Sequence, residues 1–161
     1  MSAVIEDSGE GIRRMSEHDL DEIMDIETAT YDYPWTRGIF QDCLRVGYDG
    51  WVIQFDGEIK AYGVLSKGGG EAHVLSLVVA PAMRRQGLGR ILLEHMISHC
   101  RARKISDLFL EVRPSNPAAI KLYQSMGFNE VGLRADYYPA ANGREDALVM
   151  TLTLLDAADT E

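Results

Sequence analysis

The sequence is poor in cysteine and in long apolar runs, and it has no excess of basic residues. Its two cysteines, Cys43 and Cys100, lie in predicted helices without the spacing of metal ligands, which suits a reduced cytoplasm. No apolar run approaches the roughly 18–20 residues of a membrane span. The first residues lack the basic and apolar regions of a signal peptide. We therefore expect a cytoplasmic protein with no membrane partner.

Acidic residues outnumber basic ones, which gives a formal net charge of −9 and a pI near 4.9. This balance argues against direct binding of nucleic acid, because such binding depends on basic patches. The acidity suits a basic protein or peptide substrate, and it serves solubility equally well. The 161 residues predict one domain over 12–155, between a disordered lead-in over 1–11 and an acidic tail over 156–161.

Local sequence signals predict the element order β-α-α-β-β-β-α-β-α-β-β. A capping-box pattern over Ser16–Asp19 begins the first helix, and Asp56-Gly57 predicts a hairpin turn. Asn116 caps the last helix, which ends at Gly127. The predicted strands span 12–15, 51–55, 59–65, 72–79, 107–113, 129–133 and 147–154. This order indicates an α/β fold with a mixed, mostly antiparallel central sheet, helices on both faces and right-handed crossovers around the last two helices.

A stretch rich in arginine and glycine, Arg84–Arg90, joins an apolar strand to an apolar helix. Gly87 and Gly89 let an anion approach the backbone. The start of the helix offers unpaired N–H groups and the positive end of the helix dipole. Because three arginines of the stretch add positive charge, we expect it to bind a pyrophosphate.

The spacing of this stretch separates the common classes of pyrophosphate site. A P-loop requires Lys-Ser/Thr after its glycines, and none follows here. A dinucleotide-binding fingerprint requires a third small residue, where this chain has Leu92. The stretch resembles instead the R/Q-x-x-G-x-G/A coenzyme A loop of the GCN5-related N-acetyltransferases.

That resemblance covers nearly all of residues 12–154, and within the superfamily the chain resembles the RimI-type ribosomal-protein-alanine N-acetyltransferases. The matching segments are Tyr33–Thr36, Arg85–Arg90, Leu110–Asn116, Ala119–Tyr123, Gly127–Phe128, Tyr137–Pro139 and Gly143–Ala147. It implies the acyl-CoA N-acyltransferase fold, acetyl-CoA as co-substrate, and transfer to the N-terminal alanine of the eighteenth small-subunit ribosomal protein. We expect a monomer or weak dimer whose partner is that ribosomal protein's N-terminus.

The resemblance also assigns the site residues. It implies Glu111 as general base, Tyr123 as general acid, and Tyr137 and Tyr138 at the entry of the peptide. Trp35 is either a packing anchor or a contact to the substrate. The implied cofactor-binding residues are Leu77, Val78, Val79, Arg84, Arg85, Gln86, Gly87, Leu88, Gly89, Arg90 and Asn116. The chain departs from its relatives at Arg134–Asp136, where many carry a second basic residue, and this leaves the fine substrate preference open.

The chemistry of acetyl transfer fits these residues. A peptide α-amine, with a pKa of about 7.7–8.0, is roughly one-tenth neutral at pH 7, so one carboxylate is a sufficient base. The acetyl group never needs to rest on the enzyme, and we expect direct transfer in a ternary complex. Two alternatives stay open: lysine side chains or small amines as substrates, and an acyl-CoA-binding regulatory domain without catalysis.

Two other features of the sequence are assigned no chemistry. His95 and His99 lie one helical turn apart, but without a third ligand they predict an exposed helix face rather than a metal site. Cys100 is remote from the start of its helix, where the helix dipole would activate a thiol, so we do not expect it to act as an acyl-carrying nucleophile.

Overall fold

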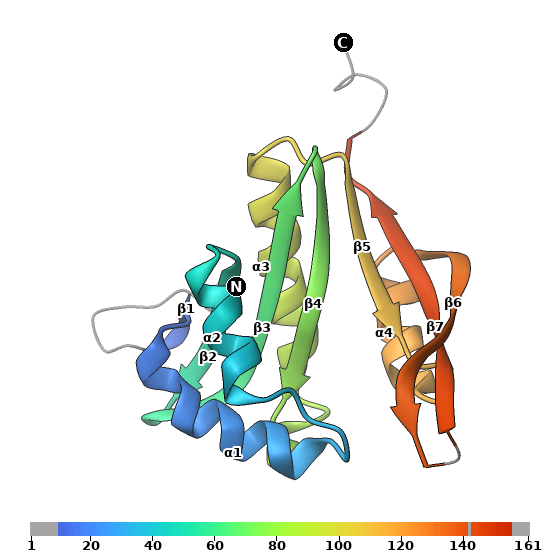
Figure 1. The fold of residues 1–161 in the computed structure, drawn as a ribbon. Coiled ribbons are helices and arrows are strands. Elements are labelled where there is room, and N and C mark those ends of the chain that lie inside the picture. The colour runs from blue at the N-terminus through green and yellow to red at the C-terminus, as the bar shows by residue number, and fades with distance from the viewer. Residues whose placement is uncertain (1–9, 142, 156–161) are drawn as a thin grey trace. The chain divides into compact units, whose positions relative to one another are not determined.

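The structure, a computed structural model, confirms the predicted order of strands and helices (Figure 1). It describes residues 10–141 and 143–155, so most of the predicted lead-in and the whole predicted tail, 156–161, lie outside the described residues. The elements are β1 (Gly11–Arg14), η1 (Glu17–Asp19), α1 (Leu20–Thr30), α2 (Arg37–Arg45), β2 (Asp49–Phe55), β3 (Glu58–Gly68), β4 (Glu71–Val79), η2 (Pro81–Met83), α3 (Leu88–Ala102), β5 (Asp107–Val112), α4 (Pro117–Ser125), β6 (Asn129–Ala140) and β7 (Gly143–Thr153).

The strands follow the order β1-β2-β3-β4-β5-β7-β6 in a seven-stranded sheet. Strands β4 and β5 pair in parallel, and β1 with β2, β2 with β3, β5 with β7, and β6 with β7 pair antiparallel. The mixed, mostly antiparallel sheet is therefore confirmed. The chain divides into two compact units: unit 1 comprises Met1–Ser66 and Leu75–Met96, and unit 2 comprises Lys67–Val74 and Ile97–Glu161.

In unit 1, helices cover both faces of the strands. On one face, Ile23 of α1 and Phe40 of α2 belong to the same buried cluster as Tyr62 of β3, and the rings of Phe40 and Tyr62 lie 5.9 Å apart. Val52 of β2 pairs with Tyr62 and belongs to the same cluster. Because alternate residues of a strand point to opposite faces, its neighbour Trp51 points to the other face. There Trp51 contacts the ring of His95 in α3, with centroids 5.2 Å apart. The strands of unit 1 thus lie between α1 and α2 on one side and α3 on the other.

Gly63 of β3 lies on the face that α3 covers. A Cβ atom there would be 2.6 Å from Cε of Met96 and 2.8 Å from the backbone oxygen of Ser76. The methionine can move, but the backbone of a neighbouring strand cannot, so we expect Gly63→Ala to lower the free energy of unfolding by about 2 kcal/mol. Gly68→Ala is the matched control, because nothing lies within 4 Å of its Cβ position. Thermal unfolding measures both, and equal midpoints would contradict this prediction.

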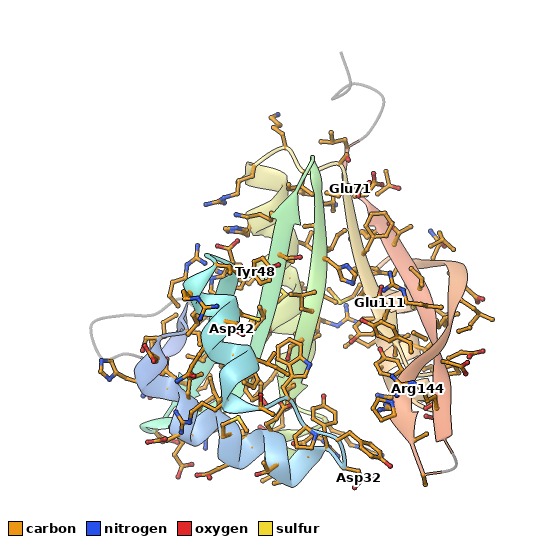
Figure 2. All side chains as sticks on the ribbon, viewed as in Figure 1. Asp32, Asp42, Tyr48, Glu71, Glu111 and Arg144 are labelled. Carbon is orange, nitrogen blue, oxygen red and sulfur yellow. The ribbon has the colours of Figure 1, made fainter. Side chains whose placement is uncertain are left out.

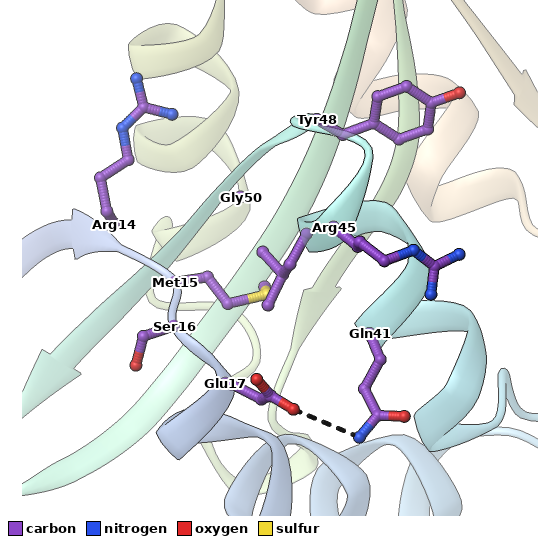
Figure 3. A pocket seen from close by; sticks show the side chains of 9 residues that line it. Arg14, Met15, Ser16, Glu17, Gln41, Arg45, Tyr48 and Gly50 are labelled. Carbon is purple, nitrogen blue, oxygen red and sulfur yellow. Dashed lines mark hydrogen bonds between the residues drawn. The ribbon is translucent and has the colours of Figure 1, made fainter.

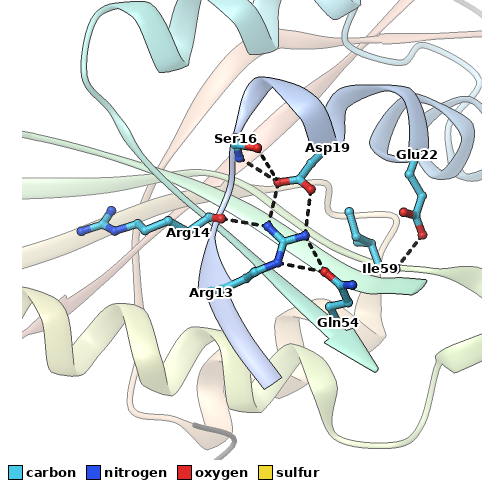
Figure 4. Close-up of polar contacts among 7 residues, drawn as sticks. All are labelled: Arg13, Arg14, Ser16, Asp19, Glu22, Gln54 and Ile59. Atoms are coloured by element: carbon cyan, nitrogen blue, oxygen red, sulfur yellow. Dashed lines mark hydrogen bonds and ion pairs between the residues drawn. The ribbon is translucent and has the colours of Figure 1, made fainter. Parts of the chain in front are cut away.

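A polar cluster holds β1 in place in unit 1 (Figure 4). The guanidinium of Arg13 donates to both carboxylate oxygens of Asp19, at 2.9 and 2.8 Å, and also to the side chain of Gln54. The backbone N–H of Ser16 donates to Asp19 at 2.8 Å, as the capping-box pattern predicts. Burial tends to raise the pKa of Asp19, but Arg13 and Ser16 outweigh it, and the pKa is lowered. The cluster holds β1 against both η1 and β2.

In unit 2, the closing hairpin is longer than the sequence predicts. The predicted strands 129–133 and 147–154 are corrected to β6, Asn129–Ala140, and β7, Gly143–Thr153. Proline and glycine, here at positions 139 and 143, are depleted within strands. Strand β6 is an edge strand, because it is last in the sheet order. An edge strand can carry a proline, because the missing N–H need not donate to a neighbouring strand. The segment that carries Tyr137 and Tyr138 is therefore strand, not loop.

The helix of unit 2 begins and ends where its capping residues predict. The side-chain oxygen of Asn116 accepts from the backbone N–H of Ala119 at 3.2 Å, and Pro117 occupies the first turn. The helix ends before Gly127, whose φ of 101° most side chains would not adopt. Tyr123 near the end of α4 packs against Phe128, with ring centroids 5.9 Å apart.

Candidate active site

The arginine- and glycine-rich stretch forms a surface loop in unit 1 that leads into α3. Arg85 and Gly87 have positive φ angles of 67° and 79°, so the loop turns sharply twice before the helix begins at Leu88. The backbone N–H of Ile91 donates to the oxygen of Gly87 at 3.0 Å. The first N–H groups of a helix lack acceptors within it. The exposed end of α3 therefore presents N–H donors and a positive dipole end.

The residues of this loop fit a pyrophosphate. Nothing lies within 4 Å of a Cβ position at Gly87, so the space above the loop is open. Leu88 is buried and anchors the helix, whereas Arg84, Arg85 and Arg90 are exposed. Positive side chains around a helix N-terminus are the arrangement that binds phosphate groups.

The strand that precedes the loop is anchored at its end. The backbone N–H of Ala80 donates to the oxygen of Lys60 at 2.9 Å. Leu77 and Val79 are half-buried and Val78 is buried. All three lie beyond the parallel register of β4 with β5, which covers Glu71–Val74.

Unit 2 holds a buried carboxylate, Glu111 on β5 (Figure 2). Leu110 and Val112 on either side of it are buried on one face of the strand, and Glu111 projects from the other, as the sequence alternation predicts. The Glu111 side chain is 6% exposed. One carboxylate oxygen, Oε1, lies 2.5 Å from Nε2 of His73, and Oε2 lies 3.7 Å from Nη2 of Arg134.

Two tyrosines of β6 share this environment. The rings of Tyr137 and Tyr138 meet edge to face, with centroids 4.8 Å apart. Arg134 lies over the Tyr137 ring at 5.0 Å, and Arg113 lies over the Tyr138 ring at 4.4 Å. Burial, and after it the negative charge of Glu111, raises the pKa of Tyr137. Both factors also raise the pKa of Tyr138. The two hydroxyls are therefore protonated at neutral pH.

Tyr123 of α4 belongs to the same part of unit 2. It is 9% exposed, and its phenol is one of the groups that raise the pKa of Tyr138. Unit 2 thus contributes Glu111, Tyr123, Tyr137 and Tyr138 from three consecutive elements, β5, α4 and β6.

Charged residues of β7 shape the strand that carries the tyrosines. Two extra residues of β6 bulge out between Arg134 and Tyr138. Within this bulge Asp136 has a φ of 51°. Its backbone N–H donates to the side chain of Asp146 at 2.9 Å, and its backbone carbonyl oxygen accepts from Nε of Arg144 at 2.8 Å. The bulge is consequently held from both sides, which sets where Tyr137 and Tyr138 point.

Glu145, between these two β7 residues, fixes the turn before α4. Its carboxylate accepts from Arg113 and from the hydroxyl and N–H of Ser115, each at 3.0 Å. The hydrogen bond from Ser115 is the largest factor that lowers the pKa of Glu145. The segment Gly143–Ala147, which the sequence analysis singled out by resemblance, therefore acts as a brace for the site.

Other predicted site residues have mainly structural contacts. The side-chain oxygen of Asn116 caps α4. Trp35 is half-buried in unit 1, where its ring centroid lies 5.1 Å from that of Phe40 and its backbone N–H donates to the carboxylate of Glu27 at 2.9 Å. These contacts show Trp35 as a packing anchor, and its contact to a substrate stays a prediction.

One residue at the site was missed, and one prediction was wrong. His73, beside Glu111, was not singled out, although it is the one ionisable residue in the predicted strand 72–79. The expected exposed face at His95 and His99 is incorrect. His95 is half-buried against Trp51, and His99 is 9% exposed, with its Nε2 3.0 Å from Nζ of Lys67. More faces of helix α3 are buried against the rest of the protein than a helix with one apolar and one polar face would bury.

A pocket of about 690 Å³ in unit 1 contains none of the predicted site residues (Figure 3). Its lining includes Met15, Arg45 and Tyr48, and the side chains of Glu17 and Gln41 are joined across it by a hydrogen bond of 3.5 Å. The site is therefore not defined by this pocket. In the part of the chain that the structure describes, no group of three or more His, Cys, Asp or Glu side chains is placed to hold a metal ion, and no helix is long and apolar enough to cross a membrane.

The match to a family model defines the class of the protein. The chain belongs to the acetyltransferase (GNAT) family, whose model matches residues 20–128. It is thus an acyltransferase, and members of this family use acetyl-CoA.

Individual relatives narrow the comparison. The chain is 40% identical over 136 residues to the [ribosomal protein bS18]-alanine N-acetyltransferase of Escherichia coli K12, covering 84% of this chain and 92% of the relative. The corresponding enzyme of Salmonella typhimurium LT2 is 39% identical over 140 residues, covering 87% and 95%. The crystal structure of the Escherichia coli ribosomal-protein-S18-alanine N-acetyltransferase matches with a TM-score of 0.85 at 38% identity, covering 91% of this chain and 94% of that chain.

Proposed function

We propose that this protein acetylates the N-terminal alanine of the ribosomal protein bS18 in the cytoplasm, with acetyl-CoA as donor. The observation that carries the proposal is the buried carboxylate of Glu111 on β5, whose charge acts on Tyr137 and Tyr138. The two tyrosines lie on the β6–β7 hairpin, which Arg144, Glu145 and Asp146 brace. The identity to relatives named for this activity supports the choice of substrate.

In this proposal the donor is held by backbone and positive charge. The N–H groups at the start of α3, with Gln86 and the arginines of the loop, bind the pyrophosphate of acetyl-CoA. Backbone groups of Leu77–Val79 bind its pantetheine arm, and one of their N–H groups polarises the thioester carbonyl. Asn116 contacts the cofactor near the thioester through the part of its side chain that does not cap α4.

Proton transfers accompany each stage of the reaction. Glu111 accepts the proton of the substrate's α-ammonium, and the neutral nitrogen then attacks the thioester carbon. As the carbon–sulfur bond breaks, Tyr123 donates its phenolic proton to the departing thiolate, the nitrogen releases its second proton to water as it becomes an amide, and water reprotonates the tyrosine. Tyr137 and Tyr138 contact the peptide, with Trp35 as a further candidate contact. The acetyl group passes directly from donor to amine in a ternary complex.

A different amine on the same scaffold is the alternative function. Lysine side chains, with a pKa of about 10.4, are neutral in under about 0.1% of molecules at pH 7 and place a greater demand on the base. An acyl-CoA-binding regulatory domain is the alternative without catalysis, and Glu111 and Tyr123 argue against it.

The test is release of free CoA from acetyl-CoA with a short peptide that carries the alanine-initiated N-terminus of bS18. The control is the same peptide with a blocked α-amine and a free lysine. We expect turnover on the first peptide only. Turnover on both, or on the blocked peptide alone, would indicate a lysine or broad-specificity enzyme. If neither peptide reacts while acetyl-CoA still binds, the proposal is wrong, and a small amine or the regulatory alternative is favoured.

A further inference from the structure

We propose that His73 is a positioning residue for Glu111, so that the base of this enzyme is a histidine–glutamate pair rather than a lone carboxylate. The inference rests on the proposed function, because it assigns a role to the partner of the residue that accepts the substrate's proton. Neither the resemblance to the family nor the comparisons with relatives assigns this histidine a role.

Strand pairing brings the two side chains together within unit 2. Strands β4 and β5 run parallel, and His73 is in register with Phe109. Glu111 is two residues further along β5, so its side chain leaves the same face as that of Phe109. The contact of 2.5 Å between Nε2 of His73 and Oε1 of Glu111 therefore follows from backbone register, and it does not depend on a flexible loop.

The contact defines which ring nitrogen carries a proton. At 2.5 Å a carboxylate oxygen and an imidazole nitrogen attract each other only with a hydrogen between them. We assign that hydrogen to Nε2 of His73, which donates to Oε1 of Glu111. This hydrogen bond fixes the rotation of the carboxylate and leaves Oε2 as the oxygen that receives the proton of the substrate amine.

The charges around Glu111 make this orientation important. Arg134 of β6 is 3.7 Å from Oε2, and its side chain is 54% exposed. The charge of Glu111 also acts on Tyr137 and Tyr138 of β6, and Arg113 and Tyr123 act on Tyr138. Without His73, the carboxylate could rotate toward the Arg134 guanidinium, and both of its oxygens would then be less available as a base. The His73 side chain is 29% exposed.

Two substitutions at position 73 separate positioning from packing. His73→Phe keeps a ring of similar size and removes the donor, and we expect kcat to fall about tenfold or more with the acetyl-CoA dissociation constant unchanged. His73→Gln places an amide N–H where Nε2 lies, and we expect it to restore most of the loss. A hydrogen bond donated to the ionised carboxylate favours that form, so the acid limb of the kcat profile should move to higher pH in His73→Phe and stay in place in His73→Gln.

His95→Phe is the matched control, because it removes an imidazole that is also half-buried but packs on Trp51 instead of a carboxylate. We expect that variant to keep the kcat and the pH profile of the unmodified enzyme. Equal kcat and pH profiles for His73→Phe, His73→Gln and the unmodified enzyme would overturn the positioning role. Equal losses in both His73 variants, with no shift of the pH profile, would show a packing role and overturn it as well.

Glu111→Gln distinguishes failure of this inference from failure of the proposed function. If Glu111→Gln is slow and His73→Phe added to it causes no further loss, the two residues act as one unit, as we expect. If the two losses multiply, His73 acts independently of Glu111, and the inference is wrong while the proposed function stands. If Glu111→Gln turns over the peptide at the full rate, Glu111 is not the base, and both assignments fail.

Discussion

Gly89→Asp is expected to abolish binding of acetyl-CoA without unfolding the protein. Gly89 lies in the first turn of α3, where a pyrophosphate would meet the helix N–H groups. An aspartate there introduces bulk and negative charge at the phosphate position. The same aspartate interacts favourably with the positive end of the helix dipole, so the stability of the helix should be kept or slightly increased. Isothermal calorimetry with acetyl-CoA measures the loss of binding.

Gly89→Ala is the matched control for this change. The coenzyme A loop that the sequence resembles accepts alanine at this position, and alanine favours a helix more than glycine does. We expect Gly89→Ala to bind acetyl-CoA within a few-fold of the unmodified protein, and both variants to unfold at or above its midpoint temperature. Undiminished binding by Gly89→Asp would refute the assignment of the loop.

Tyr123→Phe is expected to lower kcat by about 10²-fold or more while acetyl-CoA binds as before, because it removes only the group that protonates the departing thiolate. The ring packs against Phe128 with centroids 5.9 Å apart, and phenylalanine can keep that contact. Steady-state kinetics with the alanine-initiated peptide gives kcat, and calorimetry gives the dissociation constant.

Tyr48→Phe is the matched control, because it also removes a tyrosine hydroxyl, but from an exposed residue that has no role in the proposed mechanism. Tyr48 is 39% exposed and lines the pocket of unit 1. Its replacement should leave kcat unchanged. A normal turnover rate in Tyr123→Phe would remove Tyr123 from the mechanism. A loss of acetyl-CoA affinity equal to the loss of kcat would instead assign it to binding.

Short-range sequence signals were sufficient for most of the elements. Asp56 and Gly57 form the predicted turn, with φ angles of 56° and 74°, because this pair tolerates left-handed backbone that other residues avoid. Ser16, Asn116 and Gly127 likewise mark the ends of helices where capping chemistry predicts them. These features depend on neighbours along the chain, so no tertiary information is needed to find them.

The extent of the closing hairpin could not be predicted in this way. Pro139 and Gly143 usually interrupt strands, and the sequence gives no sign that β6 lies at the edge of the sheet. The bulge around Asp136 is held by Asp146 and Arg144, whose roles become visible only when β6 and β7 are paired.

By itself, the sequence determined the order of elements, and it predicted the anion loop and, through family resemblance, the roles of Glu111 and Tyr123. Each of these depends on residue types at fixed spacing, which the chain displays directly. The tertiary structure alone decided that His73 contacts Glu111, because the parallel register of β4 and β5 brings together residues 38 positions apart. It also decided that His99 is buried, since the packing around a helix depends on which elements surround it.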